Sequence, residues 1–132
     1  MHVVTIETPS LGDRTYLVHD GDVALVVDPQ RDVDRVLRAA ADEGVRISHV
    51  AETHVHNDYV SGGLTHARMT GAIYVHAAAE PLSFDYEAVG DGDSFAVGRL
   101  RVEVLHTPGH TPHHLSYLVE MPGRPPAAFT GG

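Results

Sequence analysis

The N-terminal part of the sequence contains one amphipathic helix between two short apolar strands. Strands are predicted over 23–27 and 47–52, and the intervening segment 32–44 repeats apolar residues along one helical face. Asp32 can cap this helix at its start, and Gly44 can end it in the left-handed conformation. A strand, a helix and a second strand in this order form a crossover unit with parallel strands, which is typical of α/β proteins.

Further elements are predicted around this unit. A weaker helix is expected over 62–70. The other predicted strands are rich in β-branched and apolar residues, and they cover 3–7, 15–19, 73–76, 100–105 and 115–119. The segment 91–98 is expected to begin the strands of the last third. The strands of the last third are expected to continue the sheet in a mainly antiparallel manner. The residues alone therefore predict a single α/β domain over 1–132, with one mixed sheet and helices on one face.

The composition excludes several classes of function. The 18 acidic side chains outnumber the 9 basic ones, and a net charge of -9 does not suit binding to nucleic acid or to an anionic membrane. All basic residues are arginine and there is no cysteine, so lysine Schiff bases, disulfides and thiolate metal sites are excluded. No apolar run approaches the ~20 residues of a membrane span. The start does not resemble a signal peptide, so we expect a cytoplasmic protein.

A histidine-rich segment directly follows the strand predicted over 47–52. It covers 53–59 and has the sequence Thr-His-Val-His-Asn-Asp-Tyr. In an extended chain, the side chains of His54, His56 and Asp58 point to the same side. Two imidazoles and a carboxylate that converge in this way are suitable ligands for zinc or iron. Loops at the carboxyl ends of strands are also where α/β proteins collect functional groups.

A second histidine segment follows the strand predicted over 100–105. Its sequence over 105–111 is Leu-His-Thr-Pro-Gly-His-Thr. The Pro-Gly pair is a strong turn signal and would present His110 at the tip of a loop. Each segment alone is moderately specific, whereas the two at successive strand ends are much less expected by chance.

Together the two motifs resemble those of the metallo-β-lactamase superfamily, in which HxHxDH is followed by a metal-binding histidine in a PGHT segment. The segment 52–63, Glu-Thr-His-Val-His-Asn-Asp-Tyr-Val-Ser-Gly-Gly, is similar to the branch of persulfide dioxygenases and rhodanese-associated proteins, with glyoxalase II as a near neighbour. The resemblance covers the whole chain in element order. It implies an αβ/βα sandwich of which this chain covers mainly the first half, so we expect the domain to be C-terminally incomplete.

The resemblance implies a set of site residues. His54, His56 and His110 match the histidines of the first metal site, and Asp58 matches an aspartate of the second site that can act on the nucleophilic water. Asp58 is therefore both a candidate metal ligand and the candidate catalytic residue. Tyr59 stands in place of the second-site histidine, and Gly132 stands where the family has a later metal-binding aspartate. These departures favour one divalent metal, Fe(II) or Zn(II), over a binuclear site.

Several of these residues have a purely structural alternative. The three histidines could cap strand ends or bond to backbone carbonyls. Asp58 could serve as a helix N-cap, alone or in addition to binding metal. Asp28 follows the apolar run Val-Ala-Leu-Val-Val. It resembles a family aspartate that supports the metal loop, and it is equally explicable as a turn residue.

Three functions are compatible with these residues. The first is oxidation of a low-molecular-weight thiol persulfide at a mononuclear metal, as in persulfide dioxygenases. The second is hydrolysis of a thioester by metal-bound hydroxide, as in glyoxalase II. The third is a degenerate, non-catalytic domain. A thiol-derived small molecule is the expected substrate, and the candidate protein partners are a second copy of the chain or a sulfurtransferase.

Overall fold

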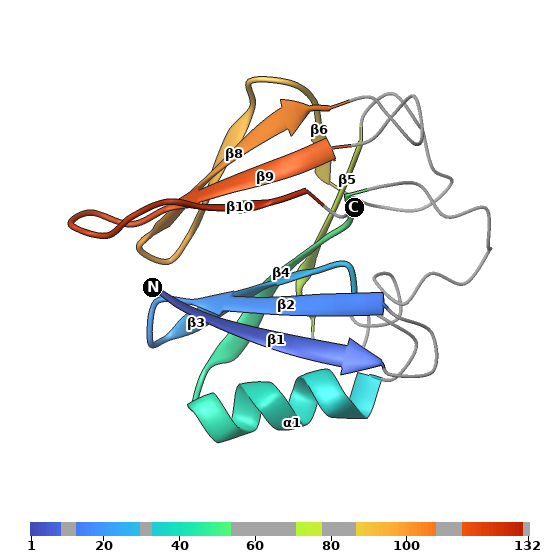
Figure 1. The fold of residues 1–132 in the computed structure, drawn as a ribbon, viewed down its shortest axis with the longest axis vertical. Coiled ribbons are helices and arrows are strands. Elements are labelled where there is room, and N and C mark those ends of the chain that lie inside the picture. Colours follow the sequence, from blue (N-terminus) through green and yellow to red (C-terminus); the bar gives the residue numbers. More distant parts are fainter. Residues whose placement is uncertain (9–12, 30–32, 54–70, 78–86, 108–114, 131–132) are drawn as a thin grey trace.

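The computed structural model describes the chain except for residues 9–12, 30–32, 54–70, 78–86, 108–114 and 131–132 (Figure 1). The elements of the described part are β1 (His2–Thr8), β2 (Asp13–His19), β3 (Val23–Val27), α1 (Val33–Glu43), β4 (Arg46–Ala51), β5 (Ile73–Ala77), β6 (Glu87–Val89), β7 (Ser94–Val97), β8 (Leu100–His106), β9 (Leu115–Glu120) and β10 (Ala127–Phe129). No helix within these described ranges is long and apolar enough to cross a membrane.

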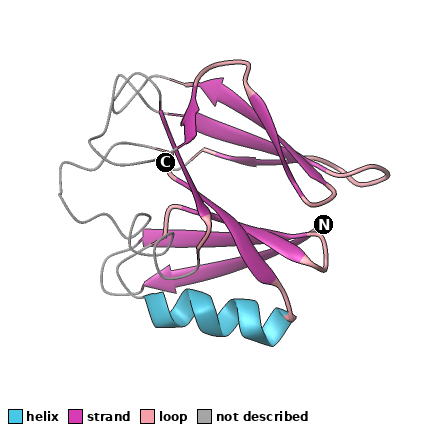
Figure 2. Ribbon diagram, turned by 180° about the vertical axis from the view of Figure 1, so that it is seen from behind, coloured by secondary structure: helices cyan, strands magenta, loops and turns pink. Residues whose placement is uncertain are grey.

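The strands form two sheets that pack face to face (Figures 1 and 2). The first has the order β1-β2-β3-β4-β5-β6, antiparallel from β1 to β3 and parallel from β3 to β6. The second is antiparallel, with the order β10-β9-β8-β7. The expectation from the residues alone of one mixed sheet is therefore wrong. The strands of the last third are antiparallel, as predicted, but they form a separate sheet.

Helix α1 covers the outer face of the first sheet (Figure 2). Its apolar side chains Val36 and Ala40 are buried and pack in one cluster with Leu17, Val26 and Val50 of the sheet. Gly44 has a φ of 69° and follows the last helical residue, so the predicted left-handed end of the helix is confirmed. The predicted cap Asp32 and the helix predicted over 62–70 lie outside the described residues.

The main core lies between the two sheets. Burial alternates along β8, where Leu100, Val102 and Val104 are buried and the residues between them are more exposed. This inward face packs against side chains of the first sheet, including Val27 and Val75. The alternation follows from the period of two in a strand, and it is the pattern expected of a sandwich with one solvated outer face.

A buried carboxylate joins the two sheets at one end of the sandwich. Asp20, in the β2–β3 turn, accepts hydrogen bonds from the backbone N–H groups of Asp22 (2.8 Å), Val23 (3.0 Å) and Arg99 (2.7 Å). Arg99 lies in the β7–β8 turn, and its guanidinium also donates to the Asp20 carbonyl. Burial of the Asp20 carboxyl favours its neutral form, but the three N–H donors and the Arg99 charge outweigh burial and lower its pKa to about 2.

This pKa predicts that Asp20 stabilises the fold in a pH-dependent way. A depressed pKa contributes stability above the unfolded value of 3.8, and this contribution is lost as the pH falls toward about 2. The Asp20 side chain is only 2% exposed, so the full contribution should be about 2 kcal/mol. In urea unfolding, the stability gap between the wild type and Asp20→Asn should shrink by about 1 kcal/mol between pH 6 and pH 3. An equal gap at both pH values would contradict this role.

Candidate metal centre

The predicted ligands belong to two loops whose ends are described. His54, His56, Asp58 and His110 lie outside the described residues, as do Tyr59 and Gly132. Within the described ranges, no three His, Cys, Asp or Glu residues are grouped so that they could hold a metal ion. The site is therefore built here from the residues that flank the two loops.

The flanking residues meet at one end of the sandwich. Asp28 directly follows β3, and Glu52 and Thr53 directly follow β4, its parallel neighbour in the sheet. Parallel strands that pair in register, here Val27 with Ala51, place their carboxyl ends at the same sheet edge. In the second sheet, the end of β8 and the start of β9 lie at this same end of the molecule (Figure 1).

Thr53 joins the bases of the two loops. Its backbone N–H donates to Asp28 Oδ1 (2.8 Å) and its hydroxyl donates to Asp28 Oδ2 (2.6 Å). Its carbonyl accepts the backbone N–H of Leu115 at 2.6 Å. Thr53 is completely buried and immediately precedes His54, while Leu115 begins β9 after the loop that contains His110. The residue before His54 is therefore bonded to the residue that follows the loop of His110, and we call this contact point the Thr53 junction.

Asp28 is held in position from several sides. Its backbone adopts a φ of 53°, a left-handed conformation that aspartate tolerates better than most residues. Its N–H donates to the Ala51 carbonyl (2.9 Å), and its carbonyl accepts the Thr15 hydroxyl (2.9 Å). These contacts favour the first of the two interpretations of Asp28, because its buried carboxylate holds Thr53, the residue before His54.

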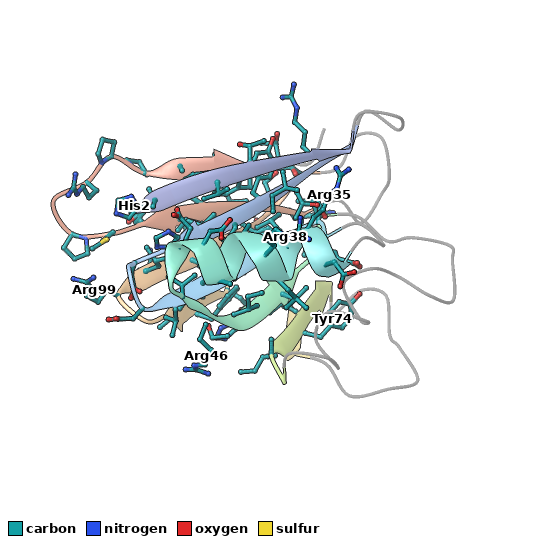
Figure 3. All side chains as sticks on the ribbon, turned by 90° about the horizontal axis from the view of Figure 1, so that it is seen from below. His2, Arg35, Arg38, Arg46, Tyr74 and Arg99 are labelled. Atoms are coloured by element: carbon teal, nitrogen blue, oxygen red, sulfur yellow. The ribbon has the colours of Figure 1, made fainter. Side chains whose placement is uncertain are left out.

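Two tyrosines hold Glu52, the residue before the Thr53 junction. The Tyr117 hydroxyl, from β9 in the second sheet, donates to the Glu52 carbonyl at 2.6 Å. The Tyr74 hydroxyl, from β5 in the first sheet, donates to Glu52 Oε2 at 2.6 Å. Tyr74 and Arg99 lie at opposite ends of the sandwich in the view of Figure 3, so this cluster is remote from the Asp20 turn.

The Tyr117 phenol remains a hydrogen-bond donor at any ordinary pH. Burial raises its pKa well above the usual range, and the negative charges of Asp28 and Glu52 raise it further.

A hydrogen bond closes the base of the second loop, since the hydroxyls of Thr107 and Ser116 lie 2.8 Å apart. The first loop therefore starts from buried residues, whereas the second starts from exposed Thr107 and ends at buried Leu115 and Ser116.

The sequence interpretation missed the supporting residues Glu52, Thr53, Tyr74 and Tyr117. A signal was present for Tyr117, because tyrosine in an apolar strand is usually buried and then needs a hydrogen-bond partner. The identity of that partner was not accessible, since Glu52 lies 65 residues earlier in the chain.

Comparison with known proteins agrees with the fold. Residues 14–123 match the family described as the metallo-beta-lactamase superfamily. A cytoplasmic hydroxyacylglutathione hydrolase from Arabidopsis thaliana is 35% identical over 130 residues, which cover 93% of this chain and 50% of the relative. An atrochrysone carboxyl ACP thioesterase from Pseudocercospora fijiensis is 29% identical over 91% of this chain and 36% of its own length. The chain thus spans half or less of these relatives.

Two solved structures share both fold and sequence similarity with the chain. A metallo-beta-lactamase from Staphylococcus aureus subsp. aureus COL superposes with a TM-score of 0.85 and 31% identity, covering 98% of this chain and 42% of that structure. ETHE1 from Myxococcus xanthus superposes with a TM-score of 0.80 and 32% identity, covering 90% of this chain and 54% of that structure. The α/β two-sheet fold and the family match agree, and the chain belongs to the metallo-β-lactamase superfamily.

Proposed function

We propose that this chain forms the metal-binding part of an enzyme that oxidises a low-molecular-weight thiol persulfide at a single divalent metal. The observation that carries the proposal is the Thr53 junction. It fixes the base of the loop with His54 and His56 against the base of the loop with His110. Fixed loop bases would reduce the ordering that imidazole ligands on these loops need in order to bind a metal.

The proposed roles of the residues follow from their chemistry. His54, His56 and His110 would hold the metal, and Asp58 would bind beside them or accept a proton from the water that is consumed. Bound iron(II) supplies open positions for dioxygen and a thiol-derived substrate. In the overall reaction, persulfide, dioxygen and water give thiol, sulfite and two protons. The terminal sulfur loses four electrons and dioxygen gains four, so no further oxidant is needed.

Hydrolysis of a glutathione thioester is the second candidate. It is favoured by two relatives named hydroxyacylglutathione hydrolase, from Arabidopsis thaliana and Maricaulis maris, at 35% and 33% identity. Tyr59 replaces a histidine of the second metal site in the family pattern, which argues against a binuclear hydrolase. Gly132 stands where the pattern has a metal-binding aspartate, and its loss counts against both functions. This alternative would use zinc rather than iron, because zinc activates bound water at neutral pH.

Metal binding should depend on His110. The wild-type protein is expected to bind about one iron or zinc per chain. His110→Ala should weaken binding by at least about 100-fold, because loss of a ligand costs more than loss of a partner around the ligands. His2→Ala, which changes an exposed histidine on β1, is the matched control and should bind metal normally.

The same preparations separate the candidate functions. Oxygen uptake with glutathione persulfide by the iron form is the result expected for the first function. Thioester cleavage by the zinc form without oxygen uptake would favour the second. A wild-type protein that binds no metal would contradict both and leave a non-catalytic domain.

A further inference from the structure

Strand β9 contacts two consecutive carbonyl groups, those of Thr53 at the start of the first histidine segment and of Glu52 before it. The Leu115 N–H donates to the Thr53 carbonyl, and the Tyr117 phenol donates to the Glu52 carbonyl, each at 2.6 Å. Leu115 and Tyr117 are two residues apart, so both face the interior of the sandwich. One strand of the second sheet thus holds the two peptide carbonyls that precede His54.

The same strand also carries the second histidine segment. β9 begins at Leu115, directly after the 108–114 segment that contains His110. Its pairing with β8 runs from His106 opposite Leu115 onward, and the Thr107–Ser116 hydroxyl contact closes the hairpin at this point. Any shift of β9 along its axis would therefore move the base of one ligand-bearing loop relative to the other.

The main-chain bond and the phenol bond have different consequences. The main-chain hydrogen bond of Leu115 fixes one point of β9 and still allows β9 to rotate about that point. The phenol of Tyr117 adds a second point of attachment farther along β9, which fixes orientation as well as distance. Burial of the phenol and the Glu52 carbonyl makes the bond costly to leave unmade, since neither group could turn to water.

We infer that Tyr117 is a positioning residue, which sets the spacing of the two ligand-bearing loops by holding the Glu52 carbonyl from the second sheet. The inference rests on the proposed metal site. It assigns to the second sheet a direct part in ligand geometry, although Tyr117 itself binds neither metal nor substrate. Tyr74 makes the complementary contact with the Glu52 side chain from within the first sheet.

Tyr117→Phe tests this role because it removes a single hydroxyl and keeps the apolar ring. The purified full-length protein should bind zinc about 10-fold more weakly or worse, as expected for loss of a partner that orients metal ligands. The visible absorption of the cobalt(II)-loaded protein should also change in intensity or position, because it reports ligand geometry. Tyr16→Phe is the matched control. Tyr16 is a half-buried tyrosine of β2 that packs on Phe129, and its variant should bind zinc as the wild type does.

The outcomes distinguish this inference from the proposed function. If the wild type binds no metal, the proposed function fails. If the wild type binds zinc and Tyr117→Phe has the same affinity and cobalt spectrum as Tyr16→Phe, the positioning role is overturned. Should Tyr117→Phe not fold, hydrogen exchange in the wild type still decides. Zinc loading should slow exchange of the buried Tyr117 hydroxyl proton at least about 10-fold, because its bond to the Glu52 carbonyl is coupled to metal binding, and equal exchange would overturn the inference.

Discussion

Replacing Asp28 with alanine is expected to lower the free energy of unfolding by about 4 kcal/mol and to abolish tight metal binding. The variant leaves the buried N–H and hydroxyl of Thr53 without their carboxylate acceptor. Each unsatisfied group costs about 1–3 kcal/mol. Alanine is also strained at the φ of 53° that residue 28 adopts, which adds about 1 kcal/mol. Urea unfolding of the metal-free protein and zinc titration measure the two effects.

Two further variants separate the causes. Asp28→Gly removes the backbone strain but not the loss of the carboxylate, so it should be about 1 kcal/mol more stable than Asp28→Ala. Asp28→Asn keeps one acceptor for the Thr53 N–H and tolerates the left-handed conformation, so it should be the mildest change. An alanine variant within 1 kcal/mol of the wild type would show that the carboxylate does not hold Thr53 in solution.

The strands and the helix were largely predictable from local patterns. Residues 23–27 are a strand exactly as bounded from the sequence, and the apolar face of α1 is buried where the helical repeat placed it. These features depend on neighbours in the chain. The strands β6 and β10 were not predicted, because three residues are too few to show a period.

The arrangement of the strands was not predictable in the same way. The alternation along 100–105 indicates a strand with one buried face, but it does not say which strands pair or which face they cover. The residues alone therefore predicted one sheet, whereas the described strands form two. The family resemblance, which implied a sandwich, corrected this error by bringing in information that the local pattern lacks.

For the candidate site, too, the sequence indicated residues but not the contacts between distant parts of the chain. The sequence predicted which histidines belong together and left Asp28 with two readings. The contacts at the bases of the histidine loops are long-range hydrogen bonds, such as Thr53 with Leu115 and Tyr117 with Glu52. Such bonds depend on how the two sheets stack, so a sequence can supply the donor and acceptor without revealing that they meet.

Gly98→Ala is expected to destabilise the fold by about 3 kcal/mol, through the Asp20 turn at the other end of the sandwich. Gly98 has a φ of 59°, and a Cβ added there would overlap Asp20 Oδ2 and the Val23 side chain. The Asp20 carboxylate cannot easily move, because three backbone N–H groups hold it. The backbone strain and the steric overlap therefore both lower the free energy of unfolding, and the urea concentration at the unfolding midpoint should fall accordingly.

Gly123→Ala is the matched control, because this glycine has a φ of 76° but no atom lies within 4 Å of an added Cβ. Gly123→Ala should lower the free energy of unfolding by only about 1 kcal/mol, which is the cost of the left-handed backbone conformation alone. The overlap can then be assigned by combining Gly98→Ala with Asp20→Ala. Without the carboxylate the alanine has more room, so the double variant should be about 1 kcal/mol more stable than additivity predicts. Additive effects, or equal losses for Gly98→Ala and Gly123→Ala, would mean that a Cβ at residue 98 is not in conflict with the Asp20 carboxylate.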